Sequence, residues 1–90
     1  MVNLAETKRA YQQIVDEWQR MLDGGGLGTA QQLAAAERRL DAVRKSAMRA
    51  IDEYTSRRFN SINTRHGLVD KLDRLHSHAL TELTSGGRHP

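Results

Sequence analysis

The sequence predicts an all-α protein of three helices, and two observations carry that expectation. Apolar residues recur at intervals of three and four over long stretches, which is the spacing of one helix face, and no useful stretch alternates as a strand would. Glycine and helix-capping residues interrupt this periodicity at two places. We therefore expect helices over about 3–23, 29–62 and 67–85, with a long central helix between two antiparallel neighbours in a helical hairpin or three-helix bundle.

The first helix has both a start and a stop signal. Asn3 can serve as the N-cap, and Glu6 three positions later completes a capping box. The apolar face repeats every seven residues at Leu4, Tyr11 and Trp18. A glycine-rich turn, GGGLG at 24–28, ends the helix because glycine adopts the left-handed backbone conformation that terminates helices.

The central helix is expected to begin at a second capping box, formed by Thr29 and Gln32. Two apolar stripes follow it, the first made of Leu33, Ala36, Leu40, Val43, Ala47, Ala50 and Tyr54, and the second of Met48, Ile51, Thr55, Phe59 and Ile62. A helix with two apolar stripes has two neighbours to contact. Residues 60–67 are poor in helix formers, and we place the break near Gly67.

The third helix carries leucines at 68, 72, 75 and 83 and ends at Gly86, with residues 86–90 expected to fray. With these boundaries, the two outer helices would overlap each other by little more than a turn or two. The long central helix would then be covered on one side only. A homodimer is the simplest remedy, since the seven-residue repeat of the first helix is typical of a coiled coil.

The composition excludes several classes of protein. The chain has 90 residues and no cysteine, so it can form neither a disulfide nor a cysteine-ligated metal site. It has no apolar run of the roughly 20 residues that span a bilayer, and its start resembles no signal peptide. We expect a single cytoplasmic domain that does not associate with membranes.

Nothing in the sequence predicts catalysis, a metal or a cofactor. The glycine run at 24–28 follows no strand and lacks the lysine of a phosphate-binding loop. His76 and His78 project about 200° apart on a helix and cannot share an ion. Ser77 lies between them, and adjacent residues on a helix do not face each other as a nucleophile and its base must. We expect no enzymatic activity, no cofactor and no small-molecule substrate.

Positive charge is concentrated in the middle of the chain. The net charge is +3, but residues 38–65 alone carry +5 and residues 1–37 carry −2. Along the central helix, Asp41 to Lys45 and Glu53 to Arg57 have the favourable spacing for ion pairs within one helix. The basic residues expected to remain unpaired are Arg38, Arg39, Arg44, Arg58, Arg65 and Lys71.

Together these observations favour a small non-enzymatic protein–protein interaction module, an adaptor or inhibitor that would suit a phage or a mobile element. We expect its partner, another protein or a second copy, to contact the apolar residues Tyr11, Trp18 and Phe59. The expected basic contacts are Arg57, Arg58, Arg65 and Lys71. The alternative is an accessory protein that binds nucleic acid through the basic central helix, because arginine suits phosphate and carboxylate equally.

Overall fold

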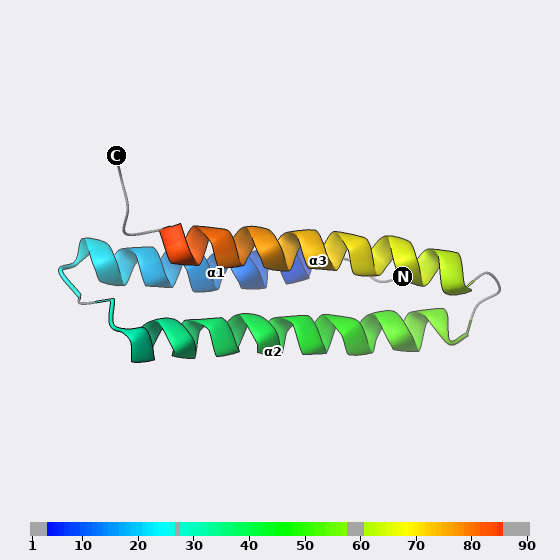
Figure 1. The fold of residues 1–90 in the computed structure, drawn as a ribbon. Coiled ribbons are helices and arrows are strands. Elements are labelled where there is room, and N and C mark those ends of the chain that lie inside the picture. The colour runs from blue at the N-terminus through cyan, green and yellow to red at the C-terminus, as the bar shows by residue number, and fades with distance from the viewer. Residues whose placement is uncertain (1–3, 27, 58–60, 86–90) are drawn as a thin grey trace.

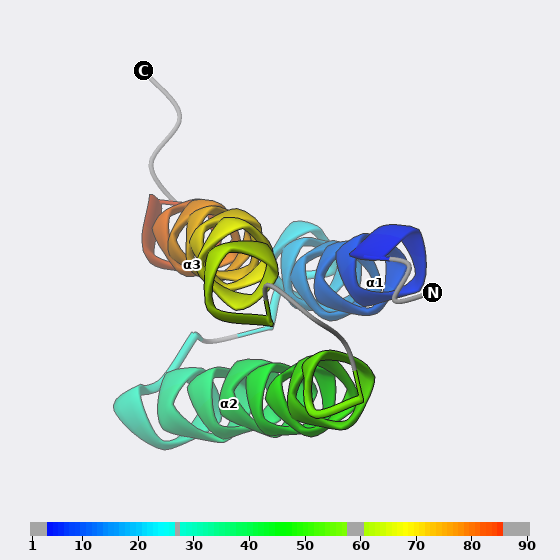
Figure 2. The same cartoon turned by 90° about the vertical axis from the view of Figure 1, so that its right-hand side faces the viewer.

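The computed structural model describes residues 4–26, 28–57 and 61–85. Within them the chain forms three α-helices and no strand, which confirms the all-α prediction. The helices are α1 (Leu4–Asp23), α2 (Ala30–Thr55) and α3 (Ser61–Ser85). They form an elongated bundle of 51 × 23 × 18 Å in which consecutive helices run antiparallel (Figure 1). Viewed along the bundle, α1 and α3 lie next to each other and α2 packs beneath both (Figure 2).

The glycines after α1 end the helix through a specific hydrogen-bond pattern. Gly25 has a φ of +88°, its N–H donates to the carbonyl of Leu22 (3.1 Å), and the N–H of Gly26 donates to that of Met21 (2.9 Å). This pair of bonds is the Schellman motif. A Cβ on Gly26 would lie only 2.7 Å from the Met21 carbonyl oxygen, so the turn requires glycine there as well.

The same turn covers the tryptophan of α1. A Cβ on Gly28 would lie 2.9 Å from Leu22 and 3.3 Å from the Trp18 ring, so the absence of a side chain lets this backbone approach the indole. Thr29 then caps α2: its hydroxyl accepts from the Gln32 N–H (3.1 Å), and its own N–H donates to the Gln32 side chain (3.2 Å). The predicted capping box is confirmed. The other predicted cap, Asn3, lies outside the described residues.

The second break is not where the sequence analysis places it. The helix α2 ends at Thr55 rather than near residue 62, and α3 begins at Ser61 rather than at 67. The hydroxyls of Thr55 and Ser56 bond back to the carbonyls of Ile51 and Glu53, a competition with helix propagation that favours termination. Gly67 lies inside α3, where its conformational cost of about 1 kcal/mol is small beside the burial that a full-length helix permits.

This shift closes the bundle. With 20, 26 and 25 residues the three helices have comparable lengths, and α1 and α3 contact each other as well as α2. α2 therefore has both α1 and α3 as neighbours on one side, while its outward side carries no helix of this chain (Figure 2). The most deeply buried side chains come from all three helices: Val15, Leu40, Ile51, Leu72 and Leu83. In the described part of the chain, no helix combines the length and apolarity needed to cross a membrane.

We expect Gly67→Ala to stabilise the protein by about 0.5–1 kcal/mol, because Gly67 lies in a helix interior with no atom within 4 Å of the added Cβ. Urea or thermal unfolding measures the change. Gly25→Ala, at the positive φ, serves as the contrasting control and should destabilise. A destabilised Gly67→Ala would place the break at Gly67 after all.

Candidate functional site

A polar cluster at the middle of the bundle joins all three helices. The hydroxyl of Tyr11 on α1 lies 3.1 Å from Nδ1 of His76 on α3, and the two rings meet edge to face with centroids 5.6 Å apart. Nε2 of His76 lies 3.6 Å from a carboxylate oxygen of Asp41 on α2. With the ring proton on Nε2, next to that carboxylate, Nδ1 accepts the hydroxyl hydrogen of Tyr11.

Tyr11 in this cluster is both buried and hard to ionise. Its side chain is 3% exposed. Burial raises its pKa from 10.0 to about 12, the Arg44 guanidinium opposes this shift, and the carboxylates of Asp41 and Asp73 add to it. A phenol with so high a pKa is a poor base and a poor nucleophile near neutral pH. The arrangement therefore suits a structural hydrogen bond rather than proton transfer to a substrate.

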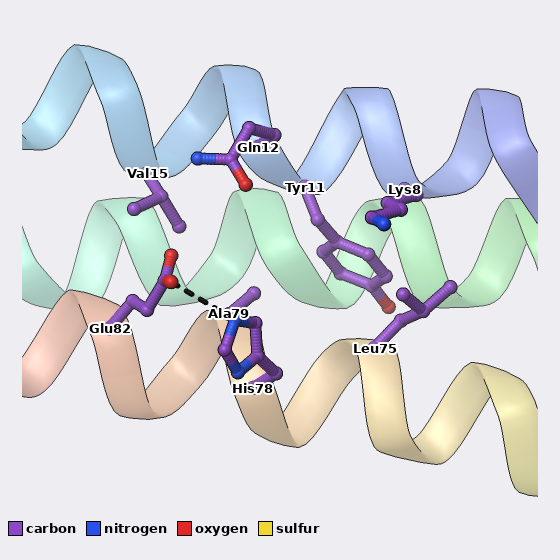
Figure 3. A pocket seen from close by; sticks show the side chains of 8 residues that line it. All are labelled: Lys8, Tyr11, Gln12, Val15, Leu75, His78, Ala79 and Glu82. Carbon is purple, nitrogen blue, oxygen red and sulfur yellow. Dashed lines mark ion pairs between the residues drawn. The ribbon is translucent and has the colours of Figure 1, made fainter.

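A small pocket lies beside this cluster, between α1 and α3 (Figure 3). Its lining residues are Lys8, Tyr11, Gln12, Val15, Leu75, His78, Ala79 and Glu82. His78 and Glu82 form an ion pair of 3.0 Å at its rim. At about 60 Å³ the pocket has room for only a few water-sized molecules, whereas sites for small molecules measure about 300–1,000 Å³. We assign it no ligand.

The histidines that the structure describes do not assemble with other ligands into a metal site. Among the residues that the structure describes, no three His, Cys, Asp or Glu side chains come together closely enough to hold an ion. His76 and His78 instead face separate carboxylates on different sides of α3, Asp41 and Glu82 respectively.

Three arginines expected to be unpaired form ion pairs between helices. Arg39 pairs with Glu17 (2.5 Å), Arg44 with Asp73 (2.9 Å) and Arg65 with Asp52 (2.9 Å). The Arg39 guanidinium lowers the pKa of the Glu17 carboxyl. All six side chains are substantially exposed, so solvent screens these pairs and they add little to stability. Their main effect is on which residues of neighbouring helices face each other.

The expected pairs within α2 are not formed. Neither Asp41 and Lys45 nor Glu53 and Arg57 come within ion-pair distance in the described residues. The Asp41 carboxylate lies beside His76 of α3 instead. A contact across helices depends on how they pack, which spacing within one helix does not reveal.

The apolar residues expected to bind a partner are placed in two ways. Tyr11 and Trp18 belong to the core of this chain, at 3% and 8% exposure, so their apolar surface is already in contact with α2, α3 and the α1–α2 turn. Phe59 lies outside the described residues. The heptad spacing that singled out Tyr11 and Trp18 marks a buried helix face equally well.

The basic residues expected to bind a partner are not all brought together. Arg57, just past the end of α2, and Arg65, on the first turns of α3, are both exposed near the turn between these helices. Arg65 is held by Asp52. Lys71 is exposed too, but its spacing places it half a turn around α3 from Ile62, away from this end. Arg58 lies outside the described residues.

Sequence analysis missed the most exposed apolar residue of this region. Ile62 is 72% exposed, and among the described residues no other large hydrophobic side chain is classed as exposed. The apolar pattern puts Ile62 on the second stripe of the central helix, whereas in the structure it belongs to α3, which begins at Ser61. The shortage of helix-forming residues from position 60 onward is the feature of the sequence that indicates a break close to Ile62. We call the exposed residues Arg57, Ile62, Arg65 and His66 the hairpin end.

We expect the hydroxyl of Tyr11 to titrate at about pH 12 in the folded protein. The stability that the protonated, buried hydroxyl provides is complete below pH 10.0, the unfolded value, and is lost as the pH rises through the folded value. Tyrosinate absorbance followed against pH measures this. Tyr11→Phe should remove the late transition and cost about 1 kcal/mol of stability, and a late transition that persists in this variant would contradict the assignment.

Comparison of the chain with protein-family models, with curated proteins and with solved structures finds no match.

Proposed function

We propose that this protein is a small non-enzymatic interaction module that binds another protein through its hairpin end. The observation that carries the proposal is the 72% exposure of Ile62. Burying an isoleucine side chain on a partner would contribute about 1.5–3 kcal/mol, a gain that the isolated chain forgoes.

The charges around Ile62 indicate the chemistry of the partner. Arg65 and His66 are exposed one helical turn from Ile62 on α3, and Arg57 is exposed just past the end of α2. The Arg65 guanidinium is oriented by its pair with Asp52. An apolar anchor with arginine beside it is a common composition for the energetic centre of a protein interface. The complementary surface is an apolar pocket with carboxylates at its rim.

This charge favours a different protein over a second copy of the chain. A symmetric dimer joined at two hairpin ends would place the arginines of one copy against those of the other, because a twofold interface uses the same surface patch twice. Like charges in such an interface oppose association. An acidic partner meets no such repulsion, and we keep the homodimer as an outcome to be tested.

A binding role agrees better with the polar groups than catalysis does. The Tyr11 hydroxyl is enclosed and bonded to His76, and the pocket beside it is about 60 Å³. A substrate could not reach the enclosed Tyr11 hydroxyl, and the pocket beside it is too small to hold one. The hairpin end, in contrast, is exposed to solvent.

Site-specific photocrosslinking tests the proposal. A photoreactive amino acid replaces Ile62 in one variant and the exposed Gln13 of α1 in a matched control, both in the native host. We expect a discrete heavier adduct from position 62, absent from position 13 and weakened by Arg57→Glu. An adduct at twice 10.2 kDa would identify a homodimer, and the same adducts from both positions would contradict the proposal.

Once a partner is in hand, Ile62→Ser should lower its affinity by about tenfold or more, equivalent to about 1.4 kcal/mol. Folding stability should change by less than about 0.5 kcal/mol, because the side chain is exposed in the free protein. Calorimetry of binding and urea unfolding measure the two effects separately. A large loss of stability would show that Ile62 is packed within its own chain.

A further inference from the structure

The outward face of α2 carries a row of basic side chains, Arg38, Lys45 and Arg49, which we call the basic row. At about 100° per residue the three lie within about 40° of one another around the helix axis, and they span about 16 Å along it. All three are exposed. The other two helices pack on the opposite side of α2, so this face is open along its length (Figure 2).

Glu53, one turn beyond Arg49, is an exposed carboxylate on the same face, and no ion pair joins the two in the described residues. The interhelix contacts account for most of the other charges near the row. They draw neighbouring charges to the flanks of α2: Arg39 turns to Glu17, Arg44 to Asp73, and the carboxylate of Asp41 lies beside His76. Asp52, one turn beyond Arg49, is paired with Arg65. In the described part of the chain no carboxylate lies within 4 Å of the three cations of the row.

We propose that the basic row binds the phosphate backbone of duplex nucleic acid, independently of the hairpin end. A protein partner is less suited to this face, because specific protein interfaces need an apolar anchor and the residue between Arg38 and Lys45 on the row is the small Ala42. A lipid surface is less suited for the same reason, since helices that bind membranes insert large apolar side chains. Contacts by charge alone suit a regular polyanion.

The number of cations sets the strength of the interaction and its dependence on salt. Three phosphate contacts give a slope of about −2.7 for the logarithm of the association constant against the logarithm of the salt concentration. A tenfold rise in salt should therefore weaken binding about 500-fold. Binding should not depend on base sequence, because the contacts reach phosphates rather than base edges.

The test compares two triple variants with the same change of charge. Arg38→Gln/Lys45→Gln/Arg49→Gln removes the basic row, and Lys8→Gln/Arg9→Gln/Arg20→Gln removes one lysine and two arginines from α1. Fluorescence anisotropy of a labelled duplex of about 20 base pairs is measured from low to physiological salt. Circular dichroism verifies that both variants are folded.

We expect the wild type to bind at low salt with the slope given above. The basic-row variant should lose at least about tenfold in affinity and most of the salt dependence, while the α1 variant retains most of both. No binding by the wild type at low salt, or equal losses in the two variants, overturns the proposal. It is also overturned if poly-glutamate or phosphatidylserine vesicles bind through the row while the duplex does not.

Discussion

The bundle depends on the register in which α3 packs antiparallel to α2. Three contacts share it: Asp52 meets Arg65, Arg44 meets Asp73 eight residues further along each helix, and Asp41 meets His76 after three more. A shift by one residue would rotate each partner by about 100° and break all three together. In this packing Leu72 of α3 is fully buried, and His76 lies within hydrogen-bond distance of the Tyr11 hydroxyl on α1. The position of α1 therefore depends on its contact with His76 of α3, and the position of α3 is set by its packing against α2.

Signals carried by neighbouring residues could be predicted from the sequence. The glycine stop after α1 and the capping box at Thr29 involve groups within five residues of each other, and both form as expected. The end of α2 was misplaced because the apolar periodicity continues through residue 62, so it gave no indication of the break, and glycine suggested a later one. The identity of residue 62 does not reveal which helix it belongs to. Only the position of the break between α2 and α3 decides whether its side chain is covered or exposed.

The candidate binding residues were harder to predict than the helices, for a related reason. Tyr11 and Trp18 lie on a periodic apolar face, which is equally consistent with a core and with an interface, and here they are core. The arginines present the same difficulty for charge. Arg38 and Arg39 are adjacent, yet Arg38 is exposed with no ion pair among the described residues, whereas Arg39 is bonded to Glu17. Whether an arginine forms an ion pair or stays exposed depends on its distance from the carboxylates of a neighbouring helix.

The shorter length of α1 has a consequence for local unfolding. α1 has 20 residues against 26 and 25, and the paired ends of α2 and α3 continue past its start (Figure 1). Local opening of a helix costs less where fewer neighbours cover it. Backbone amides should therefore exchange with solvent in a gradient, slowest around Leu40 and faster toward Arg65. The surface with the exposed isoleucine then belongs to the part of the molecule that can adjust its shape at the smallest cost.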